Sequence, residues 1–204
     1  MFSEISLIFS IAILIMSVVA HEVSHGYVAY MLGDPTAKLA GRLTLNPLKH
    51  IDPVGSIIVP IFTSIMGFTF GWAKPVPYNQ YNLRGGDKSV AVVALAGPVM
   101  NIFIAFVFGV IIKTRILDGL ASPEIYPLLI YIVLINFVLA IFNLTPIPPF
   151  DGSKVLFSFL PYNHRKIEEF LNSNQLILLF IFLFFIWGTV IDPIINTLLV
   201  YLSN

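Results

Sequence analysis

The sequence predicts an all-α polytopic membrane protein with about four spanning helices, a re-entrant segment and a short β-hairpin near the cytosolic face. Of its 204 residues, 57% are hydrophobic and only 11% are charged, whereas a soluble domain carries about 25% charged residues. The apolar residues gather into stretches of about 20, the length that crosses the hydrocarbon layer of a bilayer. We expect residues 1–204 to form a single integral membrane domain, because no stretch is suited to an appended soluble domain.

The spanning helices are predicted from four long apolar stretches. They cover residues 5–31, 90–112, 127–149 and 175–201. The first stretch has a clear helix stop at Gly33-Asp34-Pro35. A further apolar stretch at 54–71 is shorter and is interrupted by Pro60, Gly67 and Gly71. We therefore interpret it as a segment that enters the membrane and returns.

The segments between the apolar stretches indicate smaller elements. Residues 36–46 place a leucine or glycine at each odd position from 39 to 45, and this alternation predicts a strand or hairpin. Residues 151–174 are polar and contain HRKIEEF, which suggests a short helix at the membrane interface.

Composition also limits the partners. Eleven basic and eleven acidic residues give a formal net charge of zero, so nothing points to a nucleic acid partner. The chain has no cysteine, which excludes both a disulfide framework and thiolate metal ligands. The oligomeric state stays open.

The strongest chemical signal is His21-Glu22-Val23-Ser24-His25, which fits the pattern H-E-x-x-H. Residues four apart share one face of a helix, so both imidazoles can reach one ion, and the glutamate can take a proton from water activated there. Zinc suits such a set, because three protein ligands leave one position open. Two polar residues at a helix end would be the simpler explanation. His21, however, lies about 24 Å along the helix from Ile5, at a depth where ionisable groups are costly and usually functional.

Asp151 is the candidate third ligand. It follows NLTPIPPF, whose prolines break the helix at the end of the third long span. Unwound backbone at membrane depth belongs at buried or wet sites. An ordinary Asp-Gly turn at a helix exit would explain the same residues without a metal, and this alternative remains open here.

Sharing one ion requires His25 and Asp151 to lie at the same end of the membrane. They do so if residues 54–71 dip into the bilayer and return, and they do not if this segment crosses fully. The dipping arrangement puts nine Lys/Arg at the metal end and two at the other, whereas five full crossings would give six against five. The positive-inside rule then predicts that the active site lies toward the cytosol and both termini outside.

Asn101 is a candidate for the catalytic machinery. It sits about 11 residues, or roughly 17 Å, into its span, a depth suitable for meeting His21. Its amide could donate to the developing oxyanion of a reacting carbonyl. A hydrogen bond that packs two helices together is the alternative.

The motifs together resemble the site-2 protease family of intramembrane zinc metalloproteases. The resemblance rests on HEVSH, on AGPVMN at residues 96–101, and on the NLTPIPPFDG run. NPLKHIDPVG at residues 46–55 is similar to the compact branch that lacks a PDZ domain. These motifs are spread over most of the chain, and their combination is highly specific.

The resemblance implies a zinc cofactor and a role for each matching residue. The zinc ligands would be His21, His25 and Asp151, with Glu22 as general base. Asn101 would position substrate or stabilise the oxyanion, and Asn143 would support the site.

The function implied is a zinc-dependent endopeptidase that cleaves within or near transmembrane segments of other membrane proteins, often releasing a tethered regulator. Its partners would be a membrane protein with a transmembrane helix and the lipid bilayer, and the small size suggests a prokaryotic cell membrane.

Two alternatives remain. A metal-ion transporter usually repeats polar groups through the full membrane thickness, and a non-catalytic relative that only binds membrane partners would not need Glu22. Substrate cleavage that is lost in Glu22→Gln separates the protease from both.

Overall fold

The computed structural model describes residues 7–52, 54–58, 74–120, 124–161, 165–182 and 192–203, with residues 62, 122, 184, 188 and 189 singly. These residues are helical or irregular, and no strand occurs among them. The α-helices are α1 (Leu7–Met31), α2 (Thr36–Leu39), α4 (Asp87–Thr114), α5 (Ile125–Leu144), α6 (Asp151–Phe159), α7 (Arg165–Ser173), α8 (Gln175–Ile181) and α9 (Asp192–Ser203). Short 3₁₀ turns lie at Pro47–Lys49 and Gln80–Asn82, and a π-helical turn lies at Val54–Ile58.

Three helices are long and apolar enough to cross a membrane: Phe9–Met31 of α1, the whole of α4 and the whole of α5. They correspond to the first three predicted spans, and the chain is an integral membrane protein. The fourth predicted span, 175–201, is described as α8 and α9, and most positions from 183 to 191 lie outside the described residues.

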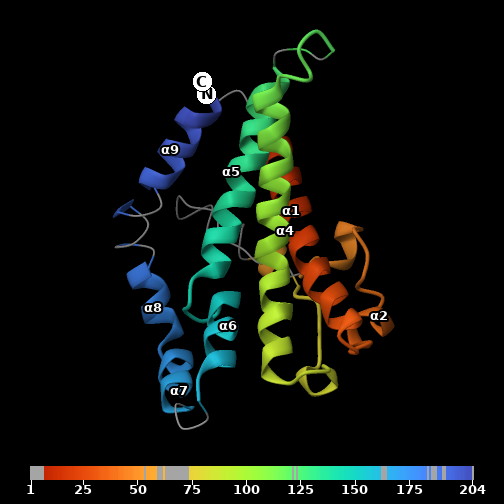
Figure 1. Ribbon diagram of the computed structural model, residues 1–204, viewed down its shortest axis with the longest axis vertical. Coiled ribbons are helices and arrows are strands. Elements are labelled where there is room, and N and C mark those ends of the chain that lie inside the picture. Colours follow the sequence, from red (N-terminus) through yellow and green to blue (C-terminus); the bar gives the residue numbers. More distant parts are fainter. Residues whose placement is uncertain are drawn as a thin grey trace.

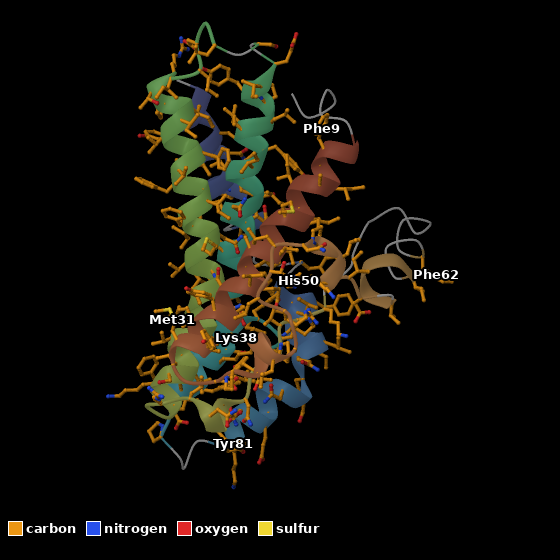
Figure 2. The ribbon with its side chains drawn as sticks, turned by 90° about the vertical axis from the view of Figure 1, so that its right-hand side faces the viewer. Phe9, Met31, Lys38, His50, Phe62 and Tyr81 are labelled. Carbon is orange, nitrogen blue, oxygen red and sulfur yellow. The ribbon has the colours of Figure 1, made fainter. Side chains whose placement is uncertain are left out.

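Helix α4 lies at the centre of the molecule and contacts α1, α5 and α6. Helices α4 and α5 run side by side, and α6 continues below α5 against the lower part of α4 (Figure 1). Helix α1 crosses this pair obliquely, with Phe9 toward one end and Met31 at the other (Figure 2). The carboxyl-terminal half of α1 is thereby brought against α4 near the start of α6.

Apolar clusters fix this arrangement at two levels. One cluster joins α4 to α5: Ala105, Ile112, Leu129, Ile130, Val133 and Leu134. A second cluster joins the end of α1 to the start of α4 through Ala29, Leu83 and Val93. Because lipid tails are as apolar as these side chains, close van der Waals packing holds the helices together here.

The hairpin predicted for residues 36–46 is wrong. The chain forms the short helix α2 and then a turn at Gly41, whose φ is +64°. Of the leucines that suggested a buried sheet face, Leu39 is 82% and Leu45 58% exposed, whereas Leu43 is half-buried and lies against Gly26 of α1. The alternation therefore does not mark one buried face. Asp34 starts the helical turn by accepting from the N–H and hydroxyl of Thr36.

The third span ends at Leu144, five residues before the predicted boundary at 149. Thr145 precedes a proline, which disfavours helical backbone, and it is extended, with φ −63° and ψ 129°. Its hydroxyl donates to the Ile141 carbonyl, which would otherwise lack a partner at the helix end.

The polar segment 151–174 contains two helices, α6 and α7, and α7 confirms the short helix predicted within HRKIEEF. The predicted re-entrant segment 54–71 lies mostly outside the described residues. Only the turn at Val54–Ile58 and residue 62 are described.

Candidate metal centre

The two histidines of HEVSH project from one face of α1 toward α4. Both imidazoles are buried, and their ring centroids are 4.6 Å apart. They lie directly against Gly97 of α4, where an added Cβ would sit 2.5 Å from Nε2 of both His21 and His25. Only glycine permits so close an approach, which explains the glycine in the AGPVMN motif.

Asp151 joins the histidines from the first residue of α6. Its Oδ2 lies 3.1 Å from His21 Nε2 and 3.0 Å from His25 Nε2, and the two Nε2 atoms are 3.0 Å apart. The next residue, Gly152, allows α6 to begin this close to α5, because a Cβ there would lie 2.3 Å from the Leu144 carbonyl oxygen. The three predicted ligands thus converge on one point, and they are the one such group of three found among the described residues.

Hydrogen bonds on the far side of each ring point both Nε2 atoms at this centre. His21 Nδ1 lies 2.6 Å from Asn101 Oδ1, and His25 Nδ1 lies 2.7 Å from the Val93 carbonyl oxygen. These oxygens only accept, so each neutral ring carries its hydrogen on Nδ1 and a lone pair on Nε2.

The donor set fits a zinc ion. Two lone pairs and a carboxylate oxygen face one another, an arrangement that requires a cation or shared protons between them. Tetrahedral zinc with bonds of about 2.0–2.1 Å separates its ligands by about 3.3 Å. The observed separations of 3.0–3.1 Å are close to this value.

Asn101 lies behind His21 and is fully buried. Its amide nitrogen donates to Asn136 Oδ1 at 2.8 Å and approaches the Ser17 carbonyl oxygen at 3.4 Å. Asn136 in turn donates to the Ser17 hydroxyl at 2.9 Å. The Asn101 amide therefore orients His21 and links α4 to α5, instead of standing free as an oxyanion donor.

Glu22 occupies a different face of α1. Its Oε2 accepts the Val76 N–H at 2.8 Å, and its carboxylate is half-buried. It lies next to the metal-ligand group in sequence but is not a member of it.

Lys154 follows one turn after Asp151, on the same helix. Its Nζ lies 2.8 Å from Asp151 Oδ1, the carboxylate oxygen that faces away from the histidines. Lys154 was not among the residues predicted for the site, although its spacing of three residues from Asp151 within a helix was a usable signal.

Two other polar residues, Asn143 and His50, lie outside this group. The Asn143 amide donates to the Leu139 carbonyl of its own helix. His50 is buried, and its Nε2 is 2.9 Å from the Thr44 carbonyl oxygen.

Comparisons with known proteins agree with this geometry. The family model described as Peptidase family M50 matches residues 111–187. Curated relatives carry the name "Putative zinc metalloprotease". YwhC of Bacillus subtilis is 35% identical over 189 residues, 90% of this chain and 84% of the relative. Rip2 of Mycolicibacterium smegmatis is 30% identical over 139 residues, 68% of this chain and about half (52%) of the relative.

A third relative, MJ0611 of Methanocaldococcus jannaschii, is 45% identical over 64 residues, 31% of each chain. No solved structure matches. An identity of 35% sustained over 90% of the chain exceeds what a shared membrane composition produces. The chain therefore belongs to peptidase family M50, the site-2 proteases, and is a zinc-dependent metallopeptidase.

Proposed function

We propose that this metallopeptidase works inside the membrane, hydrolysing peptide bonds within or near transmembrane segments of other membrane proteins in regulated intramembrane proteolysis. This proposal rests on the depth in the membrane at which His21, His25 and Asp151 converge. His21 lies about 18 Å along α1 from Phe9 and about 15 Å from Met31, the two ends of the apolar span. A peptide bond at that depth belongs to a chain that is itself in the bilayer.

In this proposal His21, His25 and Asp151 bind the zinc ion, and Glu22 is the general base. Zinc bound there would supply Lewis acidity and would lower the pKa of a water to about 7. Glu22 would take a proton from the attacking water, whose oxygen bonds the scissile carbonyl carbon, and would give that proton to the amine that leaves as the C–N bond breaks. Since Oε2 already accepts the Val76 N–H, we assign the proton to Oε1.

We propose that Asn101 is a positioning residue. Its oxygen holds the Nδ1 hydrogen of His21, and its nitrogen is engaged by Asn136 and Ser17. The role expected from the sequence, donation to an oxyanion, would require these bonds to break.

We further propose that residues 1–204 act as one domain, with the metal centre toward the cytosol and both termini outside. Helices α2, α6 and α7 and the turn before α4 lie at one end of the helix pair, while the turn after α4 lies at the other (Figure 1). Lys38 and Tyr81 both lie near Met31 at the first end (Figure 2). The segments assigned to this end carry nine of the eleven Lys/Arg, which supports a cytosolic position.

The test is to measure zinc content together with cleavage of a model transmembrane substrate, for wild type, Glu22→Gln and Glu168→Gln. Glu168 is exposed on α7 and serves as the matched control. We expect about one zinc per chain in all three, with cleavage in wild type and Glu168→Gln only. Zinc binding with cleavage that persists in Glu22→Gln would contradict the role of the base. Zinc without cleavage of any membrane substrate would favour a binding or transport protein.

A further inference from the structure

The face of α1 that carries Glu22 is covered by an extended chain. Gly26, one turn after Glu22, lies on the same face, and a Cβ added there would sit 2.5 Å from Val76 Cγ1. The side chain of Val76 fills this space and is only 5% exposed. Residues 74–78 therefore pass directly over Glu22 and Gly26, while the histidines face α4.

The covering chain can donate only one backbone hydrogen bond at this point. Val76 lies between Pro75 and Pro77, and proline has no N–H. Both prolines are exposed while Val76 is buried, and the residue before a proline is restricted to extended backbone. The one amide hydrogen in this tripeptide is the one that Glu22 Oε2 accepts, at 2.8 Å.

Arg42 holds this chain from the other side. Arg42 is only 7% exposed. Its Nη2 donates to the Lys74 carbonyl at 2.7 Å and to the Pro75 carbonyl at 3.4 Å. The Lys74 N–H donates to the His50 carbonyl at 2.9 Å. The two residues before Val76 are thus fixed by buried partners outside the metal centre.

The guanidinium is itself positioned by the chain around it. Arg42 Nη2 lies 3.5 Å from His50 Nδ1, and His50 Nε2 lies 2.9 Å from the Thr44 carbonyl oxygen. The Arg42 backbone N–H donates to the Ala37 carbonyl of α2 at 2.9 Å. We call Arg42 and His50, with these bonds, the Arg42–His50 clamp.

We propose that Pro75-Val76-Pro77 positions the Glu22 carboxylate for catalysis, and that Arg42 is a positioning residue acting through this segment. The inference rests on the proposed function, in which Glu22 is the base. A glutamate side chain has several rotatable bonds, and an N–H held by two prolines and the Arg42–His50 clamp restricts one oxygen to one place. The free oxygen is then oriented in every turnover.

This arrangement predicts how Arg42 variants differ from variants of the zinc ligands. Arg42→Met removes the donors but keeps an apolar stem, so residues 74–76 lose their anchor while His21, His25 and Asp151 keep theirs. We expect kcat to fall about 10- to 100-fold, as for other residues that orient a catalytic group, with KM and zinc content unchanged. Arg42→Lys should recover part of the rate, because its ammonium can donate to the same carbonyls. Lys49→Met, an exposed cation in the same loop, is the matched control.

A double variant distinguishes positioning from general loosening of the fold. If Arg42 acts through Glu22, Arg42→Met should cause no further loss in a Glu22→Asp background, where a carboxylate remains as base but is one methylene too short to reach the Val76 N–H. An additive loss would overturn the inference, as would a wild-type kcat in Arg42→Met. A higher kcat in Arg42→Met would also overturn it, because residues 74–78 would then act as an inhibitory cover. Wild-type protein that binds zinc yet cleaves nothing would instead remove the proposed function.

Hydrogen exchange gives a readout that needs no activity. A peptide covering residues 75–77 contains a single exchangeable amide, that of Val76. We expect its exchange to be slow in wild type and at least about tenfold faster in Glu22→Ala and Arg42→Met, and unchanged in Lys49→Met. Equal exchange in wild type and Arg42→Met would overturn the role of Arg42, whatever the cleavage assay shows.

Discussion

At the residue scale, the site depends on hydrogen-bond partners placed behind the three candidate metal ligands. Asn101 Oδ1 and the Val93 carbonyl each accept the Nδ1 hydrogen of one histidine. Lys154 Nζ donates to the outer oxygen of Asp151. Each predicted ligand therefore has one partner that fixes which atom it presents, and loss of that partner should weaken metal binding without removing a ligand.

The first prediction concerns Asn101→Leu. This change leaves the His21 Nδ1 hydrogen without a partner in a buried place, and the ring loses its preferred orientation. We expect zinc affinity to fall about 10- to 100-fold, measured by competition with a chelator. Ser24→Ala is the control, because the Ser24 hydroxyl donates to the Ala20 carbonyl of its own helix and has no other bond within the described part of the chain. Equal affinities in Asn101→Leu and wild type would contradict the positioning role.

The second prediction concerns Lys154→Met. The Asp151 carboxylate would lose the cation that holds Oδ1, so it could turn away from the histidines. Because Lys154 is partly exposed, with 42% of its side chain accessible, we expect a smaller effect, about a few-fold to tenfold lower zinc affinity. Lys166→Met, an exposed lysine on α7, should bind zinc as wild type does.

At the element scale, the length of the apolar stretches predicted the spanning helices α1 and α4 well, whereas the conformation of the loop at 36–46 depends on tertiary contacts. The ends of α1 and α4 differ little from the predicted 5–31 and 90–112, because the length of an apolar run is a property of the sequence itself. The segment at 36–46 was predicted wrongly, since alternation alone cannot distinguish a buried sheet face from a loop in which Leu43 packs on α1 while Leu39 and Leu45 are exposed.

The candidate site likewise contains features that local sequence signals predict and one that depends on a long-range contact. HEVSH and Asp151 could be predicted, because helical spacing and a break after a span are local signals. The Val76 contact with Glu22 could not, since it joins residues 54 positions apart through the backbone of a segment with no chemical signature.

The third prediction belongs to the junction after α1. Asp34 is fully buried and accepts from Thr36, Asn79 and Asn82. Burial raises the pKa of its carboxyl, but these hydrogen bonds outweigh burial and hold the pKa below its ordinary value. A depressed folded pKa stabilises the protein above the unfolded pKa of about 3.9, and this contribution is lost as pH falls through the folded value.

We therefore expect thermal stability in detergent to fall as the pH is lowered below about 4. Asp34→Asn should be less stable at pH 7 and should lose less on acidification. Asp87→Asn, at the exposed start of α4, is the control. Parallel pH profiles for wild type and Asp34→Asn would show that this carboxylate does not secure the junction.

At the scale of the whole molecule, the fourth prediction tests the orientation in the membrane. The chain has no cysteine, so one introduced cysteine reports its own location. We expect Ser122→Cys, in the turn region after α4, to react with an impermeant maleimide in intact cells, and Lys49→Cys to react only after the membrane is opened. The reverse pattern would invert the proposed topology, and labelling of both in intact cells would contradict the shared side of the metal end.

The two prolines beside Val76 also limit how a substrate can lie in the site. A peptide that adds to an exposed strand is held by a ladder of alternating donors and acceptors, and proline interrupts such a ladder. Between Pro75 and Pro77 the sole N–H is already engaged, so this stretch has no hydrogen to give to an unwound neighbour. An unwound chain could therefore meet this stretch only by donating to its carbonyls, and a ladder of alternating donors and acceptors cannot form between the two prolines.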